Sequence, residues 1–127
     1  MTHAERAMAT IELTEENFDS TLTGNDIVIV DFWASWCGPC RSFAPVFEAA
    51  SEQHSDIAFA KVNTEKQEGL AASFHIRSIP TLMIFRESVV LYAEAGALPA
   101  TALEDLITQA RNVDMQQVHA DIAVQAK

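Results

Sequence analysis

The sequence predicts an α/β fold in which a mixed central sheet of about five strands is flanked by about four helices. Short apolar and β-branched runs alternate with helix-period segments, which is typical of β-α-β units and parallel strands. Residues 81–85 and 89–95 form two strand-like runs only three residues apart. That spacing favours an antiparallel hairpin, so the sheet is expected to be mixed, with helices on both faces.

The first elements follow from local signals. Residues 10–13 predict a short strand, and Thr14 is expected to cap a helix whose first turn holds Glu15 and Glu16, near the positive end of the helix dipole. Residues 27–34 are apolar on both alternations, apart from Asp31. This pattern predicts a central strand that is covered on both faces.

The middle of the chain predicts a long helix, a strand and a short helix. Pro39 is expected to start a helix of about fifteen residues, which Pro45 should kink. Residues 57–62 predict the next strand. Thr64-Glu65-Lys66-Gln67 has the capping-box pattern and predicts a short helix over residues 65–74.

The C-terminal part predicts a closing helix that begins at Pro99, since proline suits the first helical position. Residues 114–127 still carry apolar side chains at helical spacing, so this segment is expected either to prolong the helix or to fray. We therefore expect a flexible N-terminal extension over residues 1–9, one domain over residues 10–113, and a C-terminal extension over residues 114–127.

Composition narrows the possible functions. The 127 residues fit one domain, and the formal charge is −10 at pH 7. An acidic chain repels nucleic acids and anionic membranes, so we expect neither as a partner. The longest apolar run is far too short to span a bilayer. Residues 1–17 lack the apolar core of a signal peptide, and two cysteines are too few for a secreted disulfide scaffold, so we expect a cytoplasmic location.

Both cysteines lie in Trp36-Cys37-Gly38-Pro39-Cys40, at the start of the long predicted helix. Unpaired backbone N–H groups at a helix N-terminus favour a thiolate, so Cys37 is the expected nucleophile. Cys40 lies one turn later on the same face, at a spacing that suits a disulfide, and is expected to resolve the mixed disulfide formed by Cys37. Neither intervening residue is a cation, which favours a reductant over an oxidase.

Asp31 is the second candidate for chemistry. A carboxylate in a buried strand is costly to ionise, so desolvation should raise its pKa. Asp31 could then take and return the proton of Cys40 through a water molecule. The alternative is a buried aspartate that is tied up in hydrogen bonds and has no role in the reaction.

These residues resemble a known family. Residues 30–40, followed by Ala44-Pro45, closely resemble the active-site segment of thioredoxins. Lys61-Val62-Asn63, residues 76–82 and Gly96-Ala97-Leu98 match later landmarks of the family in the same order and at the same distances. The resemblance covers roughly residues 10–113, and it implies the thioredoxin fold.

The resemblance also implies further site residues. Lys61 stands where thioredoxins pair a lysine with the buried aspartate, and Ile79-Pro80 stands where they have a cis peptide beside the disulfide. The backbone of Ile79 is expected to pair with substrate, and the rest of the substrate surface is expected to comprise Trp36, Gly38, Pro39, Pro80, Gly96 and Ala97. Some positions depart from the family pattern: Arg41 replaces a common lysine, His75 and Ser78 replace frequent glycines, and residues 85–89 replace the usual Asn-Gly turn.

The predicted function is a general protein-disulfide reductase that serves electron transport and cell redox homeostasis. The resemblance implies diverse disulfide-containing targets and recharging by a thioredoxin reductase that draws on NADPH. We expect a monomer that itself binds no cofactor. We also expect no metal, because two cysteines make half of a four-ligand zinc site and His3, His54, His75 and His119 are scattered.

Two other readings remain open at this point. One is an oxidant or isomerase in an oxidising compartment, which the Gly-Pro dipeptide opposes. The other is an interaction module that uses the same surface without turnover, which the intact set of Cys37, Cys40 and Asp31 opposes.

Overall fold

The computed structural model describes residues 9–126 and shows one five-stranded sheet with the order β1-β3-β2-β4-β5. Strands β1, β2 and β3 are parallel, whereas β4 runs antiparallel to β2 and β5 antiparallel to β4. The mixed sheet predicted from the sequence is therefore confirmed. The strands are β1 (Ile11–Glu12), β2 (Ile27–Trp33), β3 (Ala58–Asn63), β4 (Thr81–Arg86) and β5 (Val89–Ala95).

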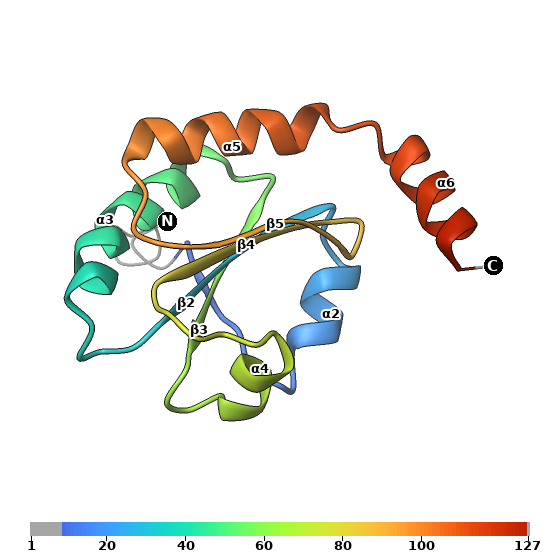
Figure 1. Cartoon of the computed structure of the whole chain (residues 1–127). Coiled ribbons are helices and arrows are strands. Elements are labelled where there is room, and N and C mark those ends of the chain that lie inside the picture. Colours follow the sequence, from blue (N-terminus) through green and yellow to red (C-terminus); the bar gives the residue numbers. More distant parts are fainter. Residues whose placement is uncertain (1–8, 127) are drawn as a thin grey trace.

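Helices cover both faces of the sheet, as expected (Figure 1). Helices α3 and α5 pack on one face through a cluster that includes Phe43, Phe47, Leu103 and Ile107. Helices α2 and α4 lie on the other face, where Leu22 and Leu70 join the second core cluster. The helices within residues 9–126 are α2 (Phe18–Thr23), α3 (Gly38–Gln53), α4 (Glu68–Ser73), α5 (Ala100–Asn112) and α6 (Met115–Gln125).

Strand β2 is the centre of the sheet and is buried on both faces. Ile27 and Ile29 pack into the cluster under α3 and α5, whereas Val28 and Val30 pack into the cluster over α2 and α4. Because side chains alternate along a strand, Asp31 falls on the face that α3 covers. The apolar pattern of β2 thus places one carboxyl group inside the core beneath α3.

Helix α2 begins later than the sequence predicts. Thr14 does not cap it, because the helix starts at Phe18 with Asn17 as its N-cap. The Asn17 side chain instead accepts from the Thr14 backbone N–H at 2.7 Å and donates to the Glu12 carbonyl at 2.9 Å. These two hydrogen bonds stabilise a turn after β1. The turn includes Glu15 and Glu16, which the sequence predicts to lie in the first turn of the helix.

The capping-box prediction for the short helix is wrong for a similar reason. Helix α4 begins at Glu68, and its N-cap is Gln67, which makes no side-chain cap bond. The Asn63 side chain, at the end of β3, accepts from the backbone N–H groups of Glu65 and Lys66 at 2.9 and 3.3 Å. An Asx-type turn therefore competes successfully with the predicted first turn of helix.

The last helices follow the prediction with small changes. Pro99 is the N-cap of α5 rather than its first residue. Earlier in the chain, α3 continues through Pro45 to Gln53. The segment after residue 113 forms α6, capped by the Asp114 carboxylate, which accepts from the Gln117 backbone N–H. Helix α6 extends beyond α5 at the edge of the molecule (Figure 1). Residues 1–8, most of the predicted N-terminal extension, lie outside the described residues.

The β4–β5 hairpin has a two-residue turn of unusual sequence. Glu87 and Ser88 have φ values of 51° and 66°, and both therefore lie in the left-handed region. A type I′ hairpin turn needs this conformation at both central positions and normally places asparagine, aspartate or glycine there. The departure from the usual Asn-Gly turn therefore leaves two side-chain-bearing residues in a conformation that L-residues disfavour.

We predict that Ser88→Gly stabilises the protein by about 1 kcal/mol, because glycine adopts positive φ without a steric cost. The free energy of unfolding in denaturant measures the effect. Ser42→Gly, an exposed change inside α3, should act in the opposite direction because glycine weakens a helix interior. Destabilisation by Ser88→Gly would show that this turn carries no such conformational cost.

Candidate redox site

The two cysteines lie at the N-terminus of α3, as predicted, and form a disulfide with a Cα–Cα distance of 5.2 Å. Cys37 is the N-cap residue, and its Sγ accepts a hydrogen bond from the Cys40 backbone N–H at 3.2 Å. Pro39 occupies the first turn, where its missing N–H leaves no helical bond unmade. The helix start therefore directs its free N–H groups toward the Cys37 sulfur.

The segment before β4 lies against this sulfur. The carbonyl oxygen of Ile79 is 3.6 Å from Cys37 Sγ, and the Ile79-Pro80 peptide is cis, as the resemblance implied. The Gly96 backbone N–H donates to the Pro80 carbonyl at 2.8 Å, with Gly96 at φ 122°, a conformation that suits glycine. The structure thus brings Cys37, Ile79, Pro80 and Gly96 together from three separate parts of the chain.

The two cysteines are buried, whereas the apolar side chain of the neighbouring Trp36 is exposed. Cys37 and Cys40 are only 4% and 2% exposed, whereas Trp36 is 67% exposed. Pro39 and Ala97 are also exposed, and Gly38 is half-buried. Of the other residues predicted for the substrate surface, Gly96 is exposed, Ile79 is half-buried and Pro80 is buried, so Pro80 is not available for direct side-chain contact.

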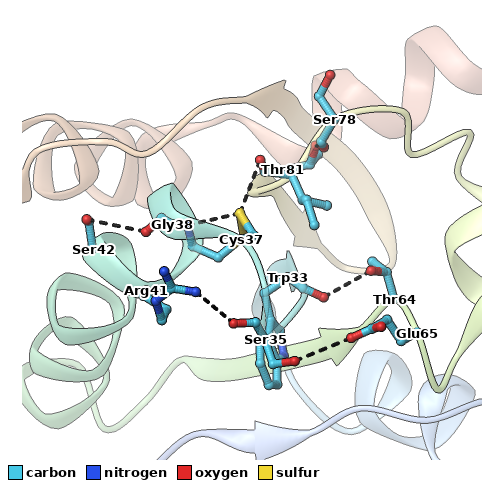
Figure 2. The surroundings of a disulfide bond; sticks show 12 residues. Trp33, Ser35, Cys37, Gly38, Arg41, Ser42, Thr64, Glu65, Ser78 and Thr81 are labelled. Carbon is cyan, nitrogen blue, oxygen red and sulfur yellow. Dashed lines mark hydrogen bonds between the residues drawn. A yellow bond between two sulfur atoms is a disulfide. The ribbon is translucent and has the colours of Figure 1, made fainter.

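The turn that carries Trp36 is held by contacts that were not anticipated from the sequence (Figure 2). Arg41 Nη1 donates to the Ser35 carbonyl at 2.9 Å, and the Ser35 hydroxyl donates to Glu65 Oε1 at 3.4 Å. The Thr64 backbone N–H and hydroxyl both donate to the Trp33 carbonyl, at 2.9 and 3.1 Å. The only signal in the sequence was an arginine one residue after the second cysteine.

Asp31 is buried to 1% exposure, and neither of its carboxyl oxygens has a hydrogen-bond partner within residues 9–126. Burial raises its pKa from the ordinary 3.8 to about 7, and the charge of Lys61 opposes this shift. The predicted elevation of the pKa is therefore borne out. Among the described residues, the carboxyl group makes none of the protein hydrogen bonds that the alternative interpretation requires.

Lys61 is the neighbour of Asp31 in the sheet, since the two residues are paired in the parallel register of β2 and β3. Its ammonium, however, lies 4.0 Å from Glu48 Oε1 and 5.0 Å from the centre of the Trp33 ring. Lys61 thus acts on Asp31 through its charge while it makes its ion pair with Glu48. The side chains of Trp33, Glu48 and Lys61 line a cleft of about 430 Å³, whose other lining residues are Thr10, Ile11, Glu12, Asn63 and Lys66.

Three of the four histidines considered as metal ligands are described by the structure, and His3 lies outside the described residues. His54 contacts Glu104 at 2.8 Å and Arg111 at 3.0 Å, His119 contacts Glu87 at 2.8 Å, and His75 is exposed with φ 55°. Over residues 9–126 no cluster of three or more His, Cys, Asp or Glu side chains is arranged to hold a metal ion. No helix in that range combines the length and apolar character needed to cross a membrane.

Comparisons with known proteins agree with this geometry. The family model named Thioredoxin matches residues 9–109. A Streptomyces coelicolor protein named "Putative thioredoxin 2" is 56% identical over 117 residues, which cover 92% of this chain and 87% of that protein. A thioredoxin of Porphyra purpurea is 41% identical over 104 residues, covering 80% of this chain and 97% of that protein.

The fold has the same counterparts among solved structures. A mutant thioredoxin from Halobacterium salinarum superimposes with a TM-score of 0.75 at 33% identity, covering 82% of this chain and 91% of that chain. The family match extends from β1 into α5 and includes the cysteine pair, Asp31 and the Ile79-Pro80 segment. The chain therefore belongs to the thioredoxin family, and it is a thiol–disulfide oxidoreductase.

Proposed function

We propose that this protein reduces disulfides in other proteins, with Cys37 as the nucleophile and Cys40 as the resolving thiol. The observation that carries the assignment is the position of Cys37 as N-cap of α3, where its sulfur accepts the Cys40 N–H. A hydrogen bond and the positive end of the helix dipole both favour the thiolate over the thiol. Cys40 lies within the helix and lacks this position.

The first half of the reaction forms a mixed disulfide. The Cys37 thiolate attacks one sulfur of the target disulfide, a bond forms between Cys37 and that sulfur, and the other target sulfur leaves as a thiolate. The exposed Trp36 and the backbone at Ile79 offer an apolar surface and a peptide edge beside the reacting sulfur. An extended segment of the target can add to such an edge as a strand, which supports a broad range of substrates.

The second half releases the reduced target. Cys40 loses its proton and attacks Cys37 Sγ, which closes the intramolecular disulfide and expels the target sulfur as a thiolate. Two electrons have then passed from the cysteine pair to the target. Asp31 supports this step because it lies on the sheet face beneath α3 and has a pKa of about 7, which matches a group that exchanges protons near neutral pH. Lys61 supports the ionised form of Asp31 through its charge.

The cycle also requires a source of electrons. Thioredoxins work without a prosthetic group, and the family generally interacts with thioredoxin reductase and disulfide substrates. We assign the recharging of the Cys37–Cys40 disulfide to a thioredoxin reductase that draws on NADPH. We place the protein in the cytoplasm as a monomer, where both of its cysteines serve exchange and none is used as a structural crosslink.

We predict that Cys40→Ser accumulates covalent adducts with partner proteins, because the thiol that releases the mixed disulfide is absent. Adducts should appear on a non-reducing gel after incubation with oxidised insulin and should disappear on addition of dithiothreitol. Cys37→Ser serves as the matched control and should form no such adducts. Equal trapping by both variants, or by neither, would contradict the assigned roles.

We predict that Asp31→Asn slows insulin reduction by about tenfold or more near pH 7, because the amide cannot accept the proton of Cys40. The wild-type rate should show an inflection near pH 7, following the pKa of Asp31, and the variant should lack it. Glu52→Gln, which removes an exposed carboxylate from α3, should leave the profile unchanged. Retention of the inflection in Asp31→Asn would exclude Asp31 as the proton acceptor.

The same variant should change how stability depends on pH. Below about pH 4 Asp31 is protonated in both the folded and the unfolded chain, whereas between pH 4 and 7 only the folded chain keeps the proton. The free energy of unfolding of the wild-type protein therefore falls as the pH rises from about 4 to about 7, by about 4 kcal/mol in total, and this loss is complete above the folded-state pKa. The free energy of unfolding of Asp31→Asn, relative to wild type, should therefore rise by up to that amount from pH 4 to 8. A difference that is flat with pH would show that Asp31 ionises as freely when folded as when unfolded.

A further inference from the structure

We propose that Arg41 is a positioning residue for protein substrates: its hydrogen bond to the Ser35 carbonyl holds the turn that places Trp36 beside Cys37. The inference rests on the proposed function, because it concerns how the same surface meets a target protein. It assigns to Arg41 a role that depends on its contact with the turn rather than on its charge.

The turn spans residues 34–37 and connects β2 to α3. It is closed by a hydrogen bond of 3.2 Å from the Cys37 N–H to the Ala34 carbonyl, which leaves Ser35 and Trp36 as its two central residues. The Ser35 carbonyl takes no part in that closure. Arg41 Nη1 donates to it at 2.9 Å, so the turn is held from a second direction (Figure 2).

Arg41 reaches the turn from a rigid base. It follows Cys40 in α3, and its backbone N–H donates to the Cys37 carbonyl at 3.2 Å. Helix α3 is fixed to the sheet by Phe43 and Phe47, which are fully buried. Since helical side chains lean toward the N-terminus, the guanidinium lies over the helix start, where Nη2 would be 3.9 Å from a Cβ placed on Gly38. Arg41 thus links Ser35 to the first turn of the helix.

Trp36 is the residue whose position this turn determines. Its side chain is 67% exposed, so the position of the ring follows from the backbone of the turn rather than from packing. On the opposite side, the Ser35 hydroxyl contacts Glu65 at 3.4 Å, which is longer than the Arg41 bond. Loss of the Arg41 contact should therefore let Trp36 move away from the mouth of the site, while the cysteine pair at the helix start stays in place.

This arrangement predicts a selective defect. A protein substrate that packs on Trp36 should lose affinity, whereas a small disulfide that needs only the sulfur should react almost normally. A purely electrostatic role of Arg41, acting on the Cys37 thiolate, would instead affect both substrates alike and would fade at high salt, where exposed charges are screened.

The test compares Arg41→Met with Arg77→Met in the full-length protein. Arg77 is also exposed and lies two residues before Ile79, so its loss removes the same charge from the same end of the molecule without a contact to the turn. For Arg41→Met we expect kcat/KM with insulin to fall about tenfold, mostly because KM rises. The rate with the small disulfide dithiobis(nitrobenzoate) should stay within about twofold of the wild-type rate. The loss should persist in 1 M salt, and Arg41→Lys, which keeps a donor, should restore most of it.

A second readout reports on the turn itself. Hydrogen exchange of the Cys37 backbone amide, which closes the turn, should be about tenfold faster in Arg41→Met and unchanged in Arg77→Met. The proposal is overturned if the two variants behave alike, if the insulin defect disappears at high salt, or if amide exchange does not change. Absence of insulin reduction by the wild-type protein would instead refute the proposed function, so the two failures are distinguishable.

Discussion

The docking of α3 across the sheet through Phe43 and Phe47 is the constraint on which the rest of the site depends. Both side chains are fully buried in the cluster that also holds residues of β2 and β4, and the Phe47 ring lies 5.3 Å from the ring of Phe59 in β3. This contact fixes the N-terminus of α3, and with it Cys37, beside the Ile79 carbonyl that precedes β4. It also covers the face of β2 on which Asp31 lies, so the packing that positions the nucleophile also removes the carboxyl group from water.

The site therefore combines two opposite electrostatic environments within one helix–strand contact. At the start of α3, free N–H groups favour negative charge on the Cys37 sulfur. Beneath the helix, burial and the lack of a hydrogen-bond partner among the described residues disfavour negative charge on Asp31. A sulfur that favours the thiolate and a carboxyl group that keeps its proton to near neutral pH are the two groups that the proposed reaction uses. The charge of Lys61 moderates the second environment without an ion pair to Asp31.

Local competition explains where predictions from the sequence were wrong. Thr14 and Thr64 each stand where a helix cap was expected, yet the side chains of Asn17 and Asn63 bind nearby backbone N–H groups and form turns instead. Both patterns satisfy the same donors, and the choice between them depends on the direction of the chain as it leaves β1 and β3. The hydrogen bond from Arg41 to the Ser35 carbonyl could not be predicted for a related reason, because any residue at position 35 would supply the same backbone acceptor.

By itself the sequence determined the order of the elements, the two-sided burial of β2, the cysteine pair at a helix start and the raised pKa of Asp31. The first three follow from the local periodicity of side chains, and the direction of the pKa shift follows from the cost of ionising a carboxyl group in a strand whose pattern predicts burial on both faces. Only the tertiary structure decided which groups meet: Ile79 with Cys37, Gly96 with Pro80, and Lys61 with Glu48 rather than with Asp31. Such contacts join segments that are distant in the chain, and they depend on strand register and helix docking, which local spacing does not encode.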